Sequence, residues 1–217
     1  MGLERCLAGD GVAVVPTDTV YGLACNPESA SGVQRVYELK RRAPLKPAAI
    51  MFFALAPALE SLVDLGPCTR GALEALLPGP VTLLLPNPEQ RFALACDPGE
   101  TNSALLGLRV PSFTGPLGTL ASVRVPAAQS SANLSGGPDP RRLADVPAEL
   151  RDSADLALDG GELPGAASTV IDLSEYERSH AWRIVREGPL GRPALERVLG
   201  LSRVTADRHA TTRRLNL

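Results

Sequence analysis

The chain alternates short apolar runs with stretches in which apolar residues recur every three or four positions. The apolar runs are rich in Val and Leu, which predicts strands. These runs are Val12–Val15, Ala48–Phe53, Val81–Leu85, Leu105–Val110, Val123–Gln129, Leu156–Leu158, Ser168–Leu173 and Trp182–Val185. The stretches with helical spacing are Ser29–Arg42, Ala56–Val63, Thr69–Leu77, Pro116–Ser122, Leu143–Asp152 and Arg192–Leu199. Because strands and helices mix without a strict strand–helix–strand repeat, the pattern predicts an α/β or α+β fold around one twisted sheet.

The stretch from Pro16 to Pro47 joins a strand end to a group of positive charges. The run Val12–Val15 stops at Pro16, and the polar turn Thr17-Asp18-Thr19 follows it. The next predicted helix ends in a cationic cluster made of Lys40, Arg41, Arg42 and Lys46. Such a cluster is typical of a solvated face whose charges also favour the C-terminal end of a helix. The hydroxyls and cations together would also suit a site for a small polar substrate and a phosphate.

Polar residues also lie at the ends of other predicted strands. Arg109 ends an apolar strand, where it either reaches solvent or binds an anion such as a carboxylate. The loop Ser130–Gly137 combines hydroxyls, an amide and glycines, as ligand-binding loops and ordinary turns both do. Ser168 opens a strand that plain β-propensity also explains. Because Arg183 and Arg186 have an odd separation, we expect them on opposite strand faces, one toward solvent and the other toward a site.

Length, composition and charge narrow the class of protein. The 217 residues suit one domain, which we place at residues 1–200, with a basic tail at residues 201–217 left unassigned. Hydrophobic residues make up 44% and aromatic residues 4%, so the core must consist mainly of Leu, Val and Ala. A formal net charge of −2 provides no overall attraction to nucleic acid. We see no signal peptide and no run of ~20 apolar residues, and therefore expect a cytoplasmic protein without a membrane segment.

Several common site signatures are absent from the sequence. It contains no GxxxxGK[ST] phosphate loop, no GxGxxG after a strand and no GxSxG elbow. The four cysteines are scattered without a CxxC pair and lie far from the two histidines, so the pattern does not indicate a zinc site. We expect the cysteines to be small core residues rather than nucleophiles. Any nucleotide site must therefore use another arrangement.

A set of ordered segments resembles the YrdC-like threonylcarbamoyl-AMP synthases. The segments are PTDTVYGL (Pro16–Leu23), the KxR element Lys40-Arg41-Arg42, LPGPVTLLLP (Leu77–Pro86), LRVP (Leu108–Pro111), SSANLSGG (Ser130–Gly137), STVID (Ser168–Asp172) and IVREG (Ile184–Gly188). Each segment alone is a weak signal, but their common order makes the match specific. The resemblance implies a single YrdC-like domain, in which a twisted mixed sheet and flanking helices surround a concave basic cavity.

The resemblance also implies a reaction and its residues. Members of the family join L-threonine, bicarbonate and ATP into threonylcarbamoyl-AMP and pyrophosphate, for the threonylcarbamoyladenosine modification of tRNA. The threonine side is implied to include Thr19, Arg109 and Ser168, with Arg109 on the substrate carboxylate. The ATP side is implied to include Lys40, Arg42, Ser131, Asn133 and Arg186. Mg²⁺ is expected with the ATP phosphates, and no residue is implied as a covalent nucleophile.

Two positions depart from the family pattern. Leu77 stands where many members have Trp, and Ser112-Phe113 stand where many have His shortly after the arginine-containing strand. Longer members add a C-terminal domain, so the chain resembles the short form of the family. In that form, separate partner proteins are implied for the transfer to tRNA, and contact with tRNA itself is expected to be indirect or weak.

Two other functions stay open from the sequence. The YrdC-like fold could serve as an RNA-binding module, although the net charge and the few aromatic residues argue against base stacking. The chain could also be a paralogue that uses another carbamoyl acceptor, as YrdC-like domains do inside larger carbamoyltransferases.

Overall fold

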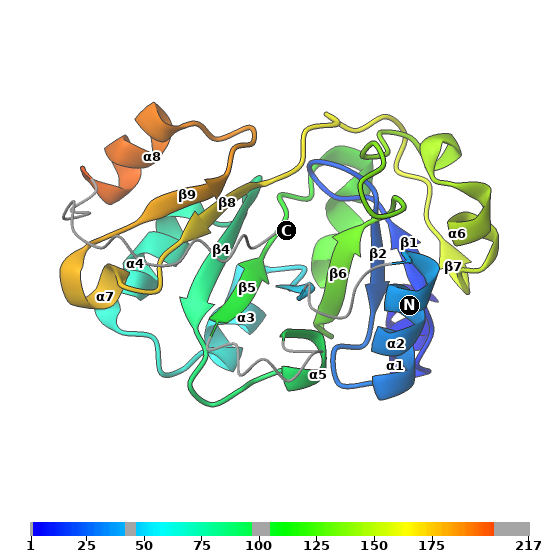
Figure 1. Cartoon of the computed structure of the whole chain (residues 1–217), viewed down its shortest axis with the longest axis horizontal. Coiled ribbons are helices and arrows are strands. Elements are labelled where there is room, and N and C mark those ends of the chain that lie inside the picture. Colours follow the sequence, from blue (N-terminus) through cyan, green and yellow to red (C-terminus); the bar gives the residue numbers. More distant parts are fainter. Residues whose placement is uncertain (1, 42–46, 97–104, 202–217) are drawn as a thin grey trace.

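The computed structural model describes residues 2–41, 47–96 and 105–201. Its strands are β1 (Ala13–Val15), β2 (Gly22–Cys25), β3 (Ala49–Met51), β4 (Val81–Pro86), β5 (Leu105–Arg109), β6 (Ala127–Ser131), β7 (Leu156–Ala157), β8 (Thr169–Asp172) and β9 (Arg183–Arg186). In this described part they form one nine-stranded sheet in the order β7-β1-β2-β6-β3-β5-β4-β8-β9. The pairs β1–β7, β3–β5 and β4–β8 are parallel, and the other neighbouring pairs of this sheet are antiparallel. The predicted mixed sheet, which Figure 1 shows to be twisted and open, is confirmed.

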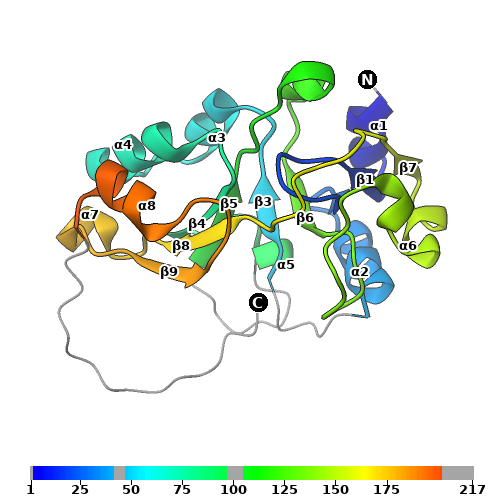
Figure 2. The ribbon, with the colours of Figure 1, turned by 90° about the horizontal axis from the view of Figure 1, so that it is seen from above.

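Helices flank the sheet on both sides (Figure 2). The α-helices are α1 (Gly2–Ala8), α2 (Ala30–Leu39), α3 (Leu55–Ser61), α4 (Pro67–Leu76), α5 (Ala93–Cys96), α6 (Ala148–Asp152), α7 (Tyr176–Ser179) and α8 (Arg192–Leu199). Two 3₁₀ helices, η1 (Gly115–Ser122) and η2 (Leu143–Asp145), complete the set for the described ranges. The described part of the chain therefore has one sheet at its centre.

Most elements match their predicted positions, and the differences have local causes. Strand β2 was not predicted, because its four residues follow the polar turn closely and pair with β1 as a hairpin. Strand β6 begins only at Ala127, since Pro126 has no N–H to donate to a neighbouring strand. The helix predicted over Leu143–Asp152 is divided at Pro147 into η2 and α6. Helix α2 ends at Leu39, with Lys40 as its C-cap, rather than at Arg42 as predicted.

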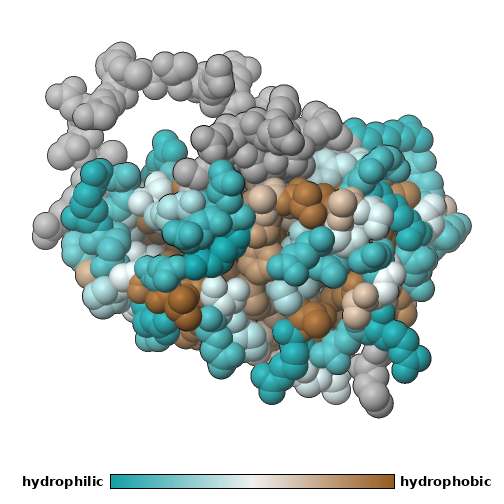
Figure 3. All heavy atoms as spheres, turned by 90° about the horizontal axis from the view of Figure 1, so that it is seen from below, coloured by the Kyte–Doolittle hydropathy of each residue, from teal (hydrophilic) through white to brown (hydrophobic). Residues whose placement is uncertain are grey.

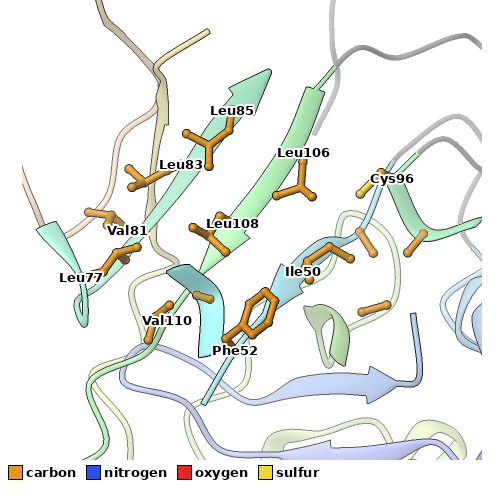
Figure 4. Packing of buried hydrophobic residues seen from close by; sticks show 14 of the residues in the cluster. Ile50, Phe52, Leu77, Val81, Leu83, Leu85, Cys96, Leu106, Leu108 and Val110 are labelled. Atoms are coloured by element: carbon orange, nitrogen blue, oxygen red, sulfur yellow. The ribbon is translucent and has the colours of Figure 1, made fainter. Parts of the chain in front are cut away.

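The alternation of side chains along the strands creates two hydrophobic clusters. The larger cluster includes Leu83 and Leu108 of neighbouring strands and the apolar face of α4, and Figure 4 shows its packing around β3, β4 and β5. The smaller cluster packs α1 against the sheet through residues such as Leu7 and Val15. Successive strand residues point to opposite faces, so Thr82 and Arg109 lie on the face opposite Leu83 and Leu108. Polar side chains of the central strands are thereby collected on one face.

An extended segment, residues 158–168, carries the chain from β7 near one edge of the sheet to β8 near the other (Figures 1 and 2). It is held by main-chain hydrogen bonds from Gly165 N to Thr19 O (2.8 Å) and from Leu163 N to Arg141 O (2.8 Å). The hydroxyl of the buried Tyr21 donates to Gly161 O at 2.9 Å. The segment thus brings Ser168, at its end, to the same region as the turn after β1.

The surface seen from below is hydrophilic on both flanks and carries apolar residues between them (Figure 3). Within the described ranges, no helix is both long and apolar enough to cross a membrane.

Candidate functional site

Arg109 is held by the turn that follows β1. Its Nη2 donates to Thr19 Oγ1 at 2.6 Å, to Asp18 Oδ1 at 2.7 Å and to Thr17 Oγ1 at 3.2 Å. Thr17 Oγ1 also donates to Val20 O at 2.7 Å, which closes the turn. The end of β5 and the turn between β1 and β2 therefore form one polar cluster. Sequence reasoning named Thr19 and Arg109 but missed Thr17 and Asp18, although both belong to the same PTDT motif.

Burial makes this arginine unusual. Arg109 is 3% exposed, and its ion pair with Asp18 lies almost entirely out of water. Burial lowers the pKa of Arg109, while the Asp18 carboxylate raises it. An arginine nevertheless stays protonated in proteins, so a positive charge is retained here. Among the described residues, Arg109 Nε is the buried side-chain polar atom without a hydrogen-bond partner. Buried N–H groups ordinarily have an acceptor, so this N–H can still pair with an acceptor from a ligand or a water molecule.

A second group forms around Ser168 at the start of β8. Arg186 Nη2 donates to Ser168 O at 2.8 Å and to Ser168 Oγ at 3.2 Å. The Ser168 hydroxyl also lies 2.8 Å from Thr82 Oγ1. Partial burial of its guanidinium lowers the pKa of Arg186, and the Asp139 carboxylate acts in the opposite direction. The structure thus pairs a residue predicted for threonine with one predicted for ATP, and it adds Thr82, a polar position inside the VTLLL strand.

The predicted placement of Arg183 and Arg186 on opposite strand faces is wrong. Arg183 pairs with Asp172 and Arg186 pairs with Val170, and the register shifts between Val170 and Ile171. Because Asp172 and Val170 are two residues apart, they share a face, and so do the two arginines opposite them. The irregularity adds one residue to β9 between the two arginines. Their odd separation therefore no longer places them on opposite faces of the sheet. The two arginines still differ in their contacts, since Arg183 pairs with the Asp172 carboxylate at 2.8 Å.

The third group joins the end of α2 to the loop after β6. Lys40 is 3% exposed, and its Nζ donates to Asn133 O at 2.8 Å and to Asn133 Oδ1 at 3.1 Å. It also donates to the main-chain carbonyl of Ser131. Ser131 Oγ donates to Asn133 Oδ1 at 2.7 Å. Lys40, Ser131 and Asn133, all predicted for the ATP side, are therefore in direct contact, and Lys40 organises the loop. Arg42 lies outside the described residues.

Main-chain and polar contacts connect the three groups. Ala132 N donates to Tyr21 O at 2.8 Å, which ties the loop after β6 to the segment after the PTDT turn. Asn133 Nδ2 lies 3.5 Å from Asp139 Oδ1, and the Asp139 charge in turn acts on Arg186. The positive charges of Arg109 and Arg186 are close enough to oppose each other. The described part of the chain thus gathers hydroxyls, amides and cations from β1, β4, β5, β6, β8 and β9 or their ends, and from the end of α2.

Within the described ranges, the structure contains no group of three or more His, Cys, Asp or Glu side chains placed to hold a metal ion. Burial raises the pKa of Cys25 to about 12, so its thiol stays protonated at neutral pH. Cys96 is also buried, whereas Cys6 and Cys68 are partly exposed, so the expected core position holds for two of the four cysteines. What the site offers is fixed donors and positive charge, which suit the binding of anionic and polar groups.

The chain is similar to a family of known proteins. The model of the Sua5/YciO/YrdC family, described as "Telomere recombination", matches residues 5–188. The threonylcarbamoyl-AMP synthase of Pyrococcus abyssi is 32% identical over 87% of this chain and 54% of its own length. The mouse threonylcarbamoyl-AMP synthase is 34% identical over 77% of this chain and 60% of its own length. The chain therefore spans between half and two thirds of the length of these two relatives. A putative threonylcarbamoyl-AMP synthase of Mycobacterium tuberculosis is 30% identical, and 84% of its length is covered.

Solved structures show the same fold. The structure of Pyrococcus abyssi Sua5 complexed with L-threonine matches with a TM-score of 0.75 and 28% identity. The match covers 91% of this chain and 56% of the Sua5 chain. The structure of Escherichia coli YciO matches with a TM-score of 0.70 and 23% identity, over 87% of this chain and 88% of the YciO chain. At this identity the match shows the fold alone. Because the family model matches residues 5–188, which include every strand of the described sheet, this chain belongs to the Sua5/YciO/YrdC family.

Proposed function

We propose that this chain is a threonylcarbamoyl-AMP synthase that uses L-threonine, bicarbonate and ATP. In this reaction the threonine amine and bicarbonate give a carbamate with loss of water. A carbamate oxygen then attacks the α-phosphorus of ATP, the bond to pyrophosphate breaks, and threonylcarbamoyl-AMP forms. The relatives that carry this activity in their names support the proposal, as does the Sua5 structure that contains L-threonine.

The observation that carries the proposal is the buried cluster around Arg109. A guanidinium that is almost fully buried and keeps one N–H without an acceptor suits a carboxylate from the substrate. The hydroxyl of Thr19, at 2.6 Å from Arg109 Nη2, lies beside it. We therefore assign the threonine carboxylate to Arg109, and place Thr19 and Ser168 on the same side of the site.

For ATP we retain the residues predicted from the sequence: Lys40, Arg42, Ser131, Asn133 and Arg186. Lys40 already has three acceptors from Ser131 and Asn133, so a phosphate would have to share or replace one of them. Mg²⁺ would enter with ATP and neutralise part of the phosphate charge. Among the residues that the structure describes, no cluster of carboxylates is placed to hold the ion without ATP. Replacement of Lys40 or Arg42 by Ala is expected to weaken ATP binding, which titration calorimetry measures.

Catalysis would rest on positioning and electrostatics. The carbamate oxygen is itself the nucleophile, so no covalent enzyme intermediate is needed. The protein's part is to hold the carbamate next to the α-phosphorus and to stabilise negative charge with fixed cations. Transfer of the product to tRNA would fall to separate proteins, and we place the reaction in the cytoplasm, where ATP and tRNA meet.

The test is incubation of the purified chain with ATP, Mg²⁺, bicarbonate and a panel of amino acids. Pyrophosphate release should require threonine and bicarbonate together, and mass spectrometry should detect threonylcarbamoyl-AMP. Serine lacks one methyl group, worth about 1–3 kcal/mol of discrimination, so it should be a poorer substrate rather than an excluded one. Equal rates with serine, or preference for another acceptor, would indicate a paralogue with different chemistry. Absence of pyrophosphate release with every amino acid would contradict the proposal.

A further inference from the structure

Asp18 links two parts of the site through its two carboxylate oxygens. Asp18 Oδ1 accepts a hydrogen bond from Arg109 Nη2 at 2.7 Å. Asp18 Oδ2 accepts one from the main-chain N–H of Ser112 at 3.0 Å. The Asp18 side chain is 10% exposed, and that of Arg109 is 4% exposed. One carboxylate therefore joins the turn after β1, the guanidinium at the end of β5 and the segment that follows β5.

The contacts of Arg109 show why such a link matters. The acceptors supplied by the protein, Thr17, Asp18 and Thr19, all meet at Nη2, while Nε has no acceptor among the described residues. Asp18 is the one of these three that carries charge, and a charged hydrogen bond is stronger and more directional than a neutral one. Its second oxygen is anchored to main chain rather than to a mobile side chain. The guanidinium is thus held on one side and left with a donor unused.

We propose that Asp18 is a positioning residue, which orients the Arg109 guanidinium so that it receives the carboxylate of the amino-acid substrate. This inference rests on the function proposed above, because it takes Arg109 as the carboxylate-binding group. Asp18 does not touch the substrate carboxylate, which would be repelled by it. It acts through Arg109, by compensating the buried positive charge before the substrate binds and by restricting the orientation of the guanidinium plane.

The first test is Asp18→Asn, which keeps the shape and one acceptor oxygen but removes the negative charge. The threonine KM should rise about tenfold or more, because a misoriented guanidinium loses part of its charged hydrogen bonding to the substrate. The ATP KM should stay within about twofold of the parent value, and kcat at saturating threonine should fall less than the threonine KM rises. If Asp18 had a merely structural role, the KM values for threonine and ATP would rise by similar factors. That result would overturn the proposal.

The chain offers a matched control in Asp155. Its Oδ2 accepts from a main-chain N–H, that of Val12, at 2.8 Å and from Arg35 Nη1 at 2.6 Å, so it also bridges backbone and an arginine. It contacts the start of β1, whereas Arg109 contacts the turn after the end of β1. Asp155→Asn is therefore expected to leave both KM values within about twofold of the parent. A rise in the threonine KM of this control equal to that of Asp18→Asn would mean that general loosening of the fold explains both results, and would overturn the proposal.

A double-mutant cycle tests whether Asp18 acts through Arg109. In an Arg109→Lys background, Asp18→Asn should raise the threonine KM by no more than about threefold, since the group to be oriented is gone. A further rise of about tenfold in that background would assign Asp18 to direct contact with the substrate and overturn the positioning role. If Asp18→Asn fails to fold, the double variant Asp18→Asn/Arg109→Gln takes its place, because it leaves no buried charge at this pair. NMR titration then compares the threonine dissociation constant of the double variant with that of Arg109→Gln alone. Equal dissociation constants support the proposal, and a tenfold loss overturns it.

The parent protein separates this inference from the function on which it rests. If the parent neither binds threonine nor releases pyrophosphate with it, the proposed function fails and the role of Asp18 fails with it. If the parent is active and Asp18→Asn keeps the parental threonine KM, only the role of Asp18 is lost.

Discussion

At the scale of single residues, the site is organised by cations that the fold removes from water. Arg109 and Lys40 are each 3% exposed, and each is surrounded by oxygens from a loop or turn. Removing a charge from water is costly unless hydrogen bonds and an opposite charge compensate it. Arg109 has such compensation from Asp18, while the Lys40 ammonium is held by carbonyl and amide oxygens of Ser131 and Asn133.

Arg109→Lys is expected to raise the threonine requirement about tenfold or more, with ATP binding nearly unchanged. A lysine keeps the charge but cannot reproduce the planar fork that binds a carboxylate through two N–H groups. Loss of one charged hydrogen bond is worth about 1.5–3 kcal/mol, or one to two decades in affinity. Separate titrations of threonine and ATP against the variant check this. Equal losses for both ligands would indicate a structural role for Arg109.

Lys40→Met is expected to lower the free energy of unfolding by about 1–3 kcal/mol as well as to weaken ATP binding. The variant keeps an apolar chain of similar length but leaves buried oxygens of Ser131 and Asn133 without their donor. Urea unfolding measures the first effect. Parental stability would contradict the loop-organising role that the contacts of Lys40 indicate.

At the scale of elements, the pairing of β8 with β9 decides where Arg186 lies. The end of β9 passes so close to the start of β8 that a Cβ on Gly188 would meet Thr169 N at 2.4 Å and Ala167 O at 2.5 Å. Both atoms belong to the main chain and cannot rotate away. A side chain at this position would therefore move the strands apart and separate Arg186 from Ser168.

Gly188→Ala should lower stability by about 1–3 kcal/mol, as overpacking does, and should weaken ATP binding if Arg186 contacts the nucleotide. Gly71 provides the control, because a Cβ there meets nothing within 4 Å and the residue lies in helix α4. Gly71→Ala should instead raise stability by about 0.5–1 kcal/mol. Thermal unfolding of the two variants compares them directly. Parental stability of Gly188→Ala would show that the strands tolerate a wider separation.

Helix α4 depends on a carboxylate from helix α7. Glu177 Oε2 accepts a hydrogen bond from Thr69 N, in the first turn of α4, at 2.7 Å. This main-chain hydrogen bond lowers the pKa of Glu177 below its usual value of 4.5. Because the folded state favours the charged form, the contribution of Glu177 to stability is complete above about pH 4.5 and is lost as the pH falls through the lowered pKa.

Glu177→Gln should therefore destabilise the protein at about pH 7, and the difference from the parent should shrink at about pH 3. Urea unfolding at the two pH values measures this difference. Glu74→Gln, on the exposed face of the same helix, should have little effect at either pH. A Glu177→Gln effect that is independent of pH would assign its cost to shape rather than charge.

At the scale of the whole molecule, one sheet connects every part of the described chain. Strand β7 lies at one edge and β9 at the other, and the larger hydrophobic cluster reaches from Val14 to Leu195 of α8. The single tryptophan, Trp182, is buried next to β9, so its fluorescence reports on that edge. Far-UV circular dichroism, in contrast, reports on all helices and strands.

The two signals should show the same urea midpoint, because a continuous sheet and core unfold cooperatively. A fluorescence transition at lower urea than the circular dichroism transition would mean that the edge formed by β8, β9 and α8 unfolds separately. The parent protein is sufficient for this experiment.

The sequence by itself determined most of the local structure and named most of the polar groups of the site. Apolar periodicity and the positions of Pro and Gly placed helix α8 at its observed bounds, Arg192–Leu199, and ordered motifs named Arg109, Thr19 and Asn133. Only the tertiary structure decided which groups meet. The acceptors of Lys40, the link from Asp18 to Ser112 and the register of β9 depend on contacts between residues distant in the chain. Periodicity reports which side of an element a residue occupies, whereas register and burial arise from how whole elements pair, and one inserted residue changes both.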